Sequence, residues 1–174
     1  MRIIIDMDEV MADAYWGLVE KYENQFNTTI DQEQVWEKKL RDLIPEEHYK
    51  IGIGYLYEPG FFRNLRVIKG AQEVIKALWD KHEVFICSAA MQFPQSLQEK
   101  SDWLDEHFPF IDWKYRILCG HKYMIDADVM LDDHAYNLEV FTGPQKLLFT
   151  SPHNIAEERF TRVDNWEAAA KLLL

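Results

Sequence analysis

The chain has 174 residues, of which 48% are hydrophobic and 28% charged, a composition typical of one globular domain with at most a small subdomain. Its net charge of −11 argues against a surface for polymeric nucleic acid, because phosphate backbones are bound by stripes of Lys and Arg. The sequence contains no apolar run long enough for a membrane span and no secretory signal, and Cys87 and Cys119 fit a reducing compartment, so we expect a cytoplasmic protein.

The first third of the chain predicts one strand followed by helices. Residues 2–5 (RIII) form an apolar run typical of a buried parallel strand. A helical stripe then covers residues 16–26 and ends at residues 27–29. Asp31 is a candidate N-cap for a second helix over residues 31–40, and a third helix should start at Pro45. Residues 51–62 are aromatic and turn-rich, so we expect them to close this helical segment.

From Lys69 onward, helical and strand patterns alternate. Helices are predicted over 70–82, 96–108 and 165–174, and strands over 83–89, 115–119, 127–133 and 145–151. Alternating elements of this kind favour right-handed crossovers and a mainly parallel sheet. We therefore predict an α/β fold with a Rossmann-like three-layer core over residues 1–13 and 66–174. Residues 14–65 would form a small inserted helical cap.

The predicted strands end in polar residues that suit phosphoryl transfer. In chain order these ends read Asp6-Met7-Asp8, Ser88-Ala89-Ala90, Gly120-His121-Lys122 and Asp132-Asp133. Because ligands bind beyond the carboxyl ends of parallel strands, we expect these groups to converge. Asp6 could attack phosphorus as a nucleophile, and Asp8 could act as general acid and then general base.

The remaining groups at these ends suit phosphate and a cation. Ser88, the amide of Ala89 and Lys122 could stabilise phosphate oxygens. A divalent cation would offset the repulsion between Asp6 and Asp132, and hard oxygen ligands favour Mg²⁺.

Each of these residues alone has a structural reading. An Asp at a strand end commonly forms a turn or an N-cap, Ser88 could cap a helix, and Lys122 could be solvated. A receiver-like phospho-acceptor domain also places acids, a hydroxyl and a lysine at strand ends, but its acceptor comes later in the chain and it lacks an inserted cap. The combination and its order favour a phosphatase.

These motifs resemble those of the haloacid dehalogenase-like hydrolase superfamily. DMDEV is similar to its first motif, DxDGx, and Ser88, Lys122 and Asp132-Asp133 match its second, third and fourth motifs. The stretches DMDEVMAD, FFRNL, KGAQEV, VFICSAA, LQEKSDWLDEHF, ILCGHK and DVMLDD more specifically resemble the 5′(3′)-deoxyribonucleotidase family. This resemblance implies Mg²⁺-dependent removal of phosphate from deoxyribonucleoside monophosphates through an aspartyl-phosphate.

The same resemblance implies roles for individual residues. Asp6 and Asp132 would bind Mg²⁺ through their side chains, and Asp8 through its backbone carbonyl. Asp133 would support the metal site, and Lys100 would be a second lysine on the phosphate side. The sequence departs from the family pattern in three places: Glu9 replaces a Gly, Ser88-Ala89 replaces the Thr-Ser-Pro of the animal members, and Gly120 replaces an Arg of those members. A Glu at position 9 implies either ordinary backbone angles or strain.

The inserted segment is rich in aromatic residues that could stack on a nucleobase. We expect most of them to be core, with Phe61, Phe62 and Arg63 as the better substrate contacts and Trp36 as a weaker one. A phosphatase for another small metabolite, such as a sugar phosphate, is the alternative. Exposed aromatics in this segment would also support a homodimer. His121 and His134 flank the motifs and could bind a metal, but histidines beside carboxylates more often tune or cap a site, so we do not count them among its residues.

Overall fold

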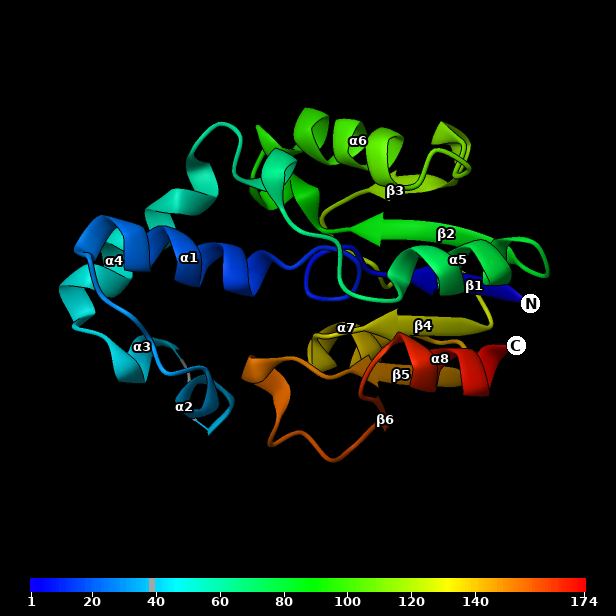
Figure 1. Cartoon of the computed structure of the whole chain (residues 1–174). Helices are drawn as coiled ribbons and strands as arrows, with labels where there is room; N and C mark the ends of the chain where they lie inside the picture. Colours follow the sequence, from blue (N-terminus) through cyan, green and yellow to red (C-terminus); the bar gives the residue numbers. More distant parts are fainter. Residues whose placement is uncertain (38–39) are drawn as a thin grey trace.

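The computed structural model describes residues 1–37 and 40–174, and a parallel sheet forms its centre (Figure 1). The strands in these residues are β1 (Arg2–Ile5), β2 (Glu83–Ser88), β3 (Arg116–Leu118), β4 (Val129–Asp132), β5 (Gln145–Phe149) and β6 (Thr161–Val163). They pair in parallel in the order β3-β2-β1-β4-β5-β6. The predicted α/β class and mainly parallel sheet are confirmed.

Helices cover both faces of the sheet. Successive side chains of β1 point to opposite faces, so they belong to two different hydrophobic cores. Ile3 and Ile5 belong to the larger core, and Ile4 belongs to the smaller one. The larger core contains side chains from α5 (Ala71–Trp79), α6 (Ser96–His107) and α8 (Trp166–Leu173), and the smaller one contains Leu138 of α7 (Ala135–Val140). The predicted three layers are therefore present.

The segment between β1 and α5 lies beyond the carboxyl ends of the strands (Figure 1). It contains α1 (Ala14–Phe26), α2 (Gln32–Glu37), α3 (Leu40–Leu43), α4 (Glu46–Gly54) and two 3₁₀ turns, η1 (Tyr55–Tyr57) and η2 (Phe62–Asn64). Asp13 caps α1 by accepting a hydrogen bond from the Trp16 amide at 3.3 Å, and Asn27 ends it in the left-handed conformation. The C-terminal end of α1 follows the prediction.

Two details of this segment differ from the sequence-based prediction. Residues 51–54, expected to be turns, continue α4, and η1 follows at once. The buried Tyr55 ring, whose hydroxyl donates to Gln25, holds this end of the segment against α1, so packing outweighs the low helix propensity of Gly52 and Gly54. Of the helix predicted over residues 31–40, residues 38–39 lie outside the described residues, and Leu40 begins α3.

The chain leaves and re-enters the core at adjacent points. Ala12 and Val67 form an antiparallel bridge, the Asp13 amide donates to the Arg66 carbonyl at 2.9 Å, and the Ile68 amide donates to a carbonyl of the opposite segment at 2.8 Å. The helical segment nevertheless shares the larger hydrophobic core with the sheet.

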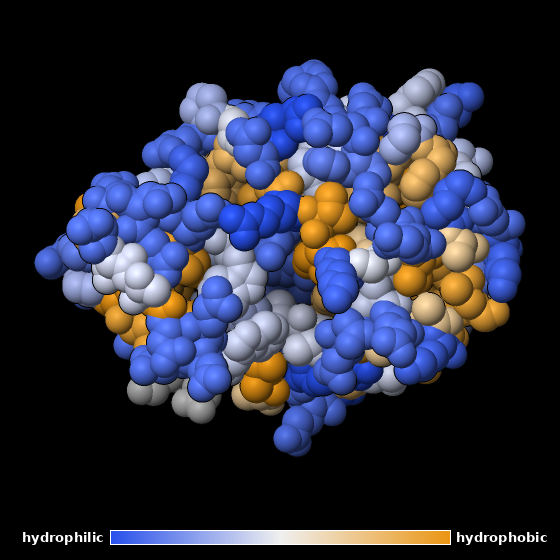
Figure 2. Space-filling model, in the orientation of Figure 1, coloured by the Kyte–Doolittle hydropathy of each residue, from blue (hydrophilic) through white to orange (hydrophobic). Residues whose placement is uncertain are grey.

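Hydrophilic side chains dominate the face of the molecule seen in Figure 2, and smaller hydrophobic areas interrupt them. Within the described residues, the helices are too short or too polar to cross a membrane.

Candidate active site

Three carboxylates meet at the carboxyl ends of β1 and β4. One oxygen each from Asp6, Asp132 and Asp133 lies within 4.8 Å of the others, and all three residues are buried. Their meeting follows from the sheet order, because β1 and β4 are neighbours and the Asp6 amide donates to the Leu131 carbonyl at 2.9 Å. The two acidic segments that the sequence places far apart therefore form one cluster.

Lys122 is the buried cation of this cluster. Its Nζ lies 2.6 Å from Asp6 Oδ1 and 2.6 Å from Asp132 Oδ2. Burial disfavours the charged form of Lys122, but Asp6 and Asp132 outweigh that effect and raise its pKa. Asp132 is also held by Asn137, whose Nδ2 donates to Oδ1 at 3.0 Å, and by the amide of His134 at 2.9 Å.

A second lysine joins the other two motif residues. Lys100 Nζ donates to Asp8 Oδ2 at 2.5 Å and to Ser88 Oγ at 2.8 Å. It is 1% exposed, and its Nζ lies 4.6 Å from the centre of the Phe62 ring, a distance typical of a cation–π contact. Lys100 thus lies between the first and second motifs, and Lys122 lies between the first and fourth.

The carboxylate cluster fits a divalent cation. Burial raises the pKa of Asp6 well above its usual range, and the charge of Lys122 opposes this rise. Asp132, Asp133 and Asp8 add further negative charge. Both side-chain oxygens of Asp133 and one of Asp8 are buried without a hydrogen-bond partner among the described residues. A hard cation would satisfy these oxygens and favour the ionised carboxylates.

A pocket of about 270 Å³ opens over this cluster. Asp6, Asp8, Ala89 and Lys122 line it on the side of the sheet. The helical segment and the loop after β2 supply mostly apolar side chains to its other walls: Ala14, Tyr15, Leu18, Leu56, Phe62 and Phe93. The pocket therefore combines a charged floor with walls that suit a planar or apolar group.

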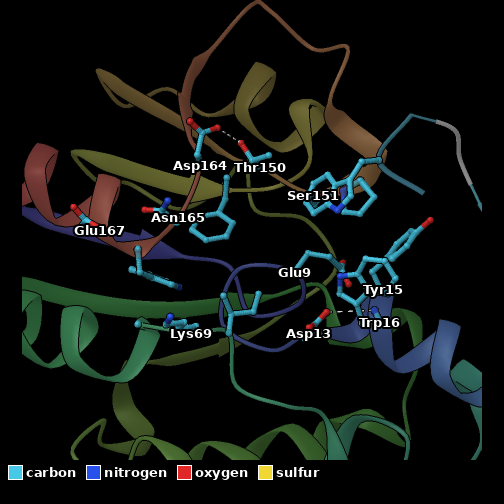
Figure 3. Close-up of a pocket in the computed structure, with 16 residues that line it drawn as sticks. Glu9, Asp13, Tyr15, Trp16, Lys69, Thr150, Ser151, Asp164, Asn165 and Glu167 are labelled. Atoms are coloured by element: carbon cyan, nitrogen blue, oxygen red, sulfur yellow. Dashed lines mark hydrogen bonds between the residues drawn. The ribbon is translucent and has the colours of Figure 1, made fainter. Parts of the chain in front are cut away.

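The four predicted substrate contacts lie in different places. Phe62 lines the pocket. Phe61 is buried beside Gly17 and Leu65 and does not line it, and Arg63 forms a surface ion pair with Glu106. Trp36 lines a different cavity, of about 450 Å³, beside α8 (Figure 3).

Glu9 adopts the left-handed conformation, with φ of 57°. Of the two alternatives for a Glu at this position, the strained one is therefore observed. Its side chain lines both the pocket over the acidic cluster and the cavity in Figure 3, where it lies beside Tyr15. Desolvation and then the charges of Asp133 and Asp8 raise the pKa of Glu9 well above its usual range.

Sequence reasoning missed several residues at the site. Asn137 contacts both oxygens of Asp132, and His153 and Tyr136 line the pocket. A polar residue on the first turn of a helix directly after Asp132-Asp133 was the available signal for Asn137. His153 lies in the 3₁₀ turn η5 (Pro152–Asn154) after β5, where Ser151 and Pro152 indicate the start of a helical turn but do not indicate that the turn reaches the site.

Known proteins resemble this chain in sequence or in fold. A 5′(3′)-deoxyribonucleotidase of Bacillus subtilis (strain 168) is 42% identical over 175 residues, covering 99% of this chain and 98% of the relative. One of Bacillus phage SPbeta has the same identity and coverage. The structure of a haloacid dehalogenase-like family hydrolase from Streptococcus pneumoniae shares the fold, with a TM-score of 0.60 at 13% identity over 98% of this chain and 97% of that one.

The family model for 5′ nucleotidase, deoxy (pyrimidine), cytosolic type C protein (NT5C) matches residues 1–174. Together with relatives above 40% identity over nearly the full length, this match shows that the chain belongs to the 5′(3′)-deoxyribonucleotidase family.

Proposed function

We propose that this enzyme is a Mg²⁺-dependent phosphomonoesterase that hydrolyses deoxyribonucleoside monophosphates. The observation that carries the proposal is the meeting of Asp6 with Asp132 and Asp133 around Lys122. Membership of the family and the printed activity of the Bacillus subtilis relative support the substrate class.

In the first half-reaction, a carboxylate oxygen of Asp6 attacks the phosphorus atom. A bond forms between that oxygen and phosphorus, and the bond from phosphorus to the sugar oxygen breaks. Asp8 donates its proton to the leaving oxygen, which departs as the nucleoside hydroxyl. Lys122, 2.6 Å from Asp6 Oδ1, orients the nucleophile and holds positive charge beside the phosphate.

In the second half-reaction, water attacks the aspartyl-phosphate. Asp8 takes a proton from that water, which releases inorganic phosphate and regenerates the Asp6 carboxylate. Ser88, Lys100 and the amide of Ala89 would donate hydrogen bonds to phosphate oxygens. Mg²⁺, held by Asp6, Asp132, the Asp8 carbonyl and the surroundings of Asp133, would neutralise phosphate charge in both steps.

We assign residues 14–65 to a cap that closes the pocket over the sugar and base. Phe62 and the apolar side chains of Leu18, Leu56 and Phe93 would contact the nucleoside. A cytoplasmic location remains part of the proposal, in line with the free thiols of Cys87 and Cys119. The basis for a homodimer is narrow, since among the segment's aromatics only Trp36 and Tyr57 are exposed.

The decisive experiment measures phosphate release from a panel of deoxyribonucleotides, ribonucleotides and sugar phosphates. Deoxyribonucleoside monophosphates should be hydrolysed fastest, and faster turnover of sugar phosphates would favour the alternative phosphatase. An aspartyl-phosphate that persists for minutes would instead favour a receiver-like domain.

The replacement Asp6→Asn should abolish turnover while the fold is kept, because the amide removes the nucleophilic charge and preserves the shape. Asp126→Asn is the matched control, since Asp126 is exposed on the loop before β4. Steady-state kinetics and circular dichroism of both variants test this expectation. A near-normal rate for the Asp6 variant would overturn the mechanism.

A further inference from the structure

Two histidines gather at the outer side of the acidic cluster. His153 Nε2 lies 3.0 Å from Asp133 Oδ2, and His134 Nε2 lies 3.7 Å from the same oxygen. One potential ligand atom from each of these three residues lies within 4.8 Å of the others. This second cluster combines two imidazole nitrogens with Asp133, which also belongs to the oxygen cluster of Asp6 and Asp132.

The two imidazoles are held in place by neighbouring groups. Ser151 Oγ lies 2.8 Å from His153 Nδ1 and 3.3 Å from His153 Nε2, and this Nε2 also lies 3.3 Å from the Asp133 carbonyl oxygen. The two rings stack with centroids 4.4 Å apart, and His134 also stacks on Tyr136 at 5.0 Å. Metal-binding histidines are commonly oriented by a hydrogen bond to the second ring nitrogen, and Ser151 provides such a contact here.

The loop that carries His153 is tied to Asp133 itself. Asn154 Nδ2 donates to the Asp133 carbonyl at 2.8 Å and to the Phe149 carbonyl at 2.7 Å. These bonds fix the distance between the end of β5 and the end of β4. The geometry around Asp133 is therefore built by the fold and does not depend on a mobile surface side chain.

Among the described residues, the imidazoles of His153 and His134 are the side chains that approach the buried Asp133 carboxylate as ion-pair partners. The Asp133 side chain is fully buried, and neither carboxylate oxygen accepts a hydrogen bond from the described residues, although His153 is close. A buried carboxylate in this state is costly unless a cation is bound. Asp133 belongs both to the oxygen cluster with Asp6 and Asp132 and to the cluster with the two histidines.

The donor set of this second cluster differs from that of the first. Two imidazole nitrogens and one carboxylate oxygen suit Zn²⁺ and other borderline transition metals, whereas an all-oxygen set suits Mg²⁺. Ligands of a tetrahedral zinc ion lie about 3.4 Å apart when each bond is about 2.0–2.1 Å long. The distances of 3.0 and 3.7 Å from Asp133 Oδ2 to the two nitrogens lie on either side of this value.

We propose that Asp133, His134 and His153 form a transition-metal site that takes Zn²⁺, next to the oxygen cluster and sharing Asp133 with it. The side chains of His134 and His153 are 40% and 26% exposed, so solvent can reach the ion and complete its coordination. Because Asp133 is shared, Zn²⁺ and Mg²⁺ compete for it. Zn²⁺ therefore inhibits the Mg²⁺-dependent reaction. This inhibition rests on the proposed function, but the binding of Zn²⁺ is independent of it.

The test uses the whole chain, treated with EDTA and dialysed, without substrate. Calorimetric titration with Zn²⁺ should show a site whose affinity falls about tenfold or more in His153→Gln and in His134→Gln. Co²⁺ should produce visible absorption bands typical of nitrogen ligation, and these bands should weaken in both variants. His121→Gln is the matched control, since His121 is exposed near the site but outside the cluster, and it should bind both metals unchanged.

Equal Zn²⁺ affinity in all three variants would overturn the proposal, because the ion would then be held by carboxylates alone. Thermal melting of each variant checks the fold, and the partly exposed His134 is the safer substitution of the two. In an activity assay at saturating Mg²⁺, Zn²⁺ should inhibit the parent chain more strongly than His134→Gln. A chain that binds Zn²⁺ through these histidines but hydrolyses no nucleotide would contradict the proposed function and leave the metal site standing.

Discussion

At the scale of single residues, Asp8 and Asp6 have different lysine partners. Lys100 contacts Asp8, and Lys122 contacts Asp6. This separation suits a pair in which one carboxylate attacks phosphorus and the other transfers a proton. It also allows the two roles to be tested independently.

Replacement of Asp8 by Asn should lower kcat for a deoxyribonucleoside monophosphate by about 10²–10⁴-fold, because the leaving alkoxide loses its proton donor. p-Nitrophenyl phosphate has a leaving group that needs no proton, so formation of its aspartyl-phosphate should be much less affected. Burst-phase kinetics with both substrates measure this difference. An equal loss in the first step for both would show that Asp8 does not act as the general acid.

The pair of thiols near the second motif gives a pH-dependent prediction. Cys87 Sγ and Cys119 Sγ are 3.7 Å apart, and the hydrogen bond from Cys87 lowers the pKa of Cys119 to about 7. The charge of Lys122 acts in the same direction, and burial opposes it. The thiolate of Cys119 is the reactive form, so its fraction rises as the pH passes through this value.

Alkylation of Cys119 by iodoacetamide should therefore reach half its maximal rate near pH 7. In Cys87→Ala the midpoint should move upward, toward the ordinary value of 9.0. Mass spectrometry of the labelled peptides reports the rate at each thiol. A midpoint in the parent chain that already equals that of the variant would contradict the role of Cys87.

At the scale of elements, α6 binds residues 60–63, the part of the helical segment that leads back to the sheet. Glu99 on α6 accepts hydrogen bonds from the amides of Gly60 at 2.6 Å, Phe62 at 3.0 Å and Arg63 at 3.2 Å. One carboxylate thus satisfies three backbone donors around η2. These hydrogen bonds also place the Phe62 ring against Lys100, which lies on α6 next to Glu99.

Replacement of Glu99 by Ala should lower the free energy of unfolding by about 2–3 kcal/mol, because it leaves these amides without their charged acceptor. Glu99→Gln should cost less, since it keeps one acceptor oxygen. Urea denaturation followed by circular dichroism measures both. Glu106→Ala is the control, because its ion pair with Arg63 lies on the surface and should contribute little.

At the scale of the whole molecule, the buried acidic cluster links stability to cation binding. Mg²⁺ at about 100 times its dissociation constant should stabilise the folded chain by about 2.7 kcal/mol, which corresponds to a rise in Tm of about 5–10 °C. EDTA should abolish both this rise and the hydrolytic activity. Scanning calorimetry measures the shift, and an Asp132→Asn chain that keeps it would place the cation elsewhere.

The sheet and its motif residues could be predicted from sequence because parallel topology constrains them. In a parallel sheet, an acidic residue that follows a strand lies at the edge formed by the carboxyl ends of the strands. Asp6 and Asp132 therefore lie close together because β1 and β4 are neighbours. The short polar elements α7 and β6 were not predicted, because neither carries a clear period.

Side chains fixed by distant partners were also beyond prediction. Arg63 looked free to meet substrate, but Glu106 on α6 pairs with it. His153 reaches Asp133 through a loop whose position depends on Asn154. Such pairings depend on the finished fold, and local sequence does not reveal them.

The paired chain segments at Ala12 and Val67 have an evolutionary consequence. The segment that leaves the core and the segment that re-enters it are neighbours, so the length of the chain inserted between them does not change the hydrogen bonding of the sheet. A different insert could therefore replace residues 14–65 and change the substrate selectivity while the catalytic residues of the core are kept. The new insert would have to supply apolar side chains that fill the same part of the larger hydrophobic core.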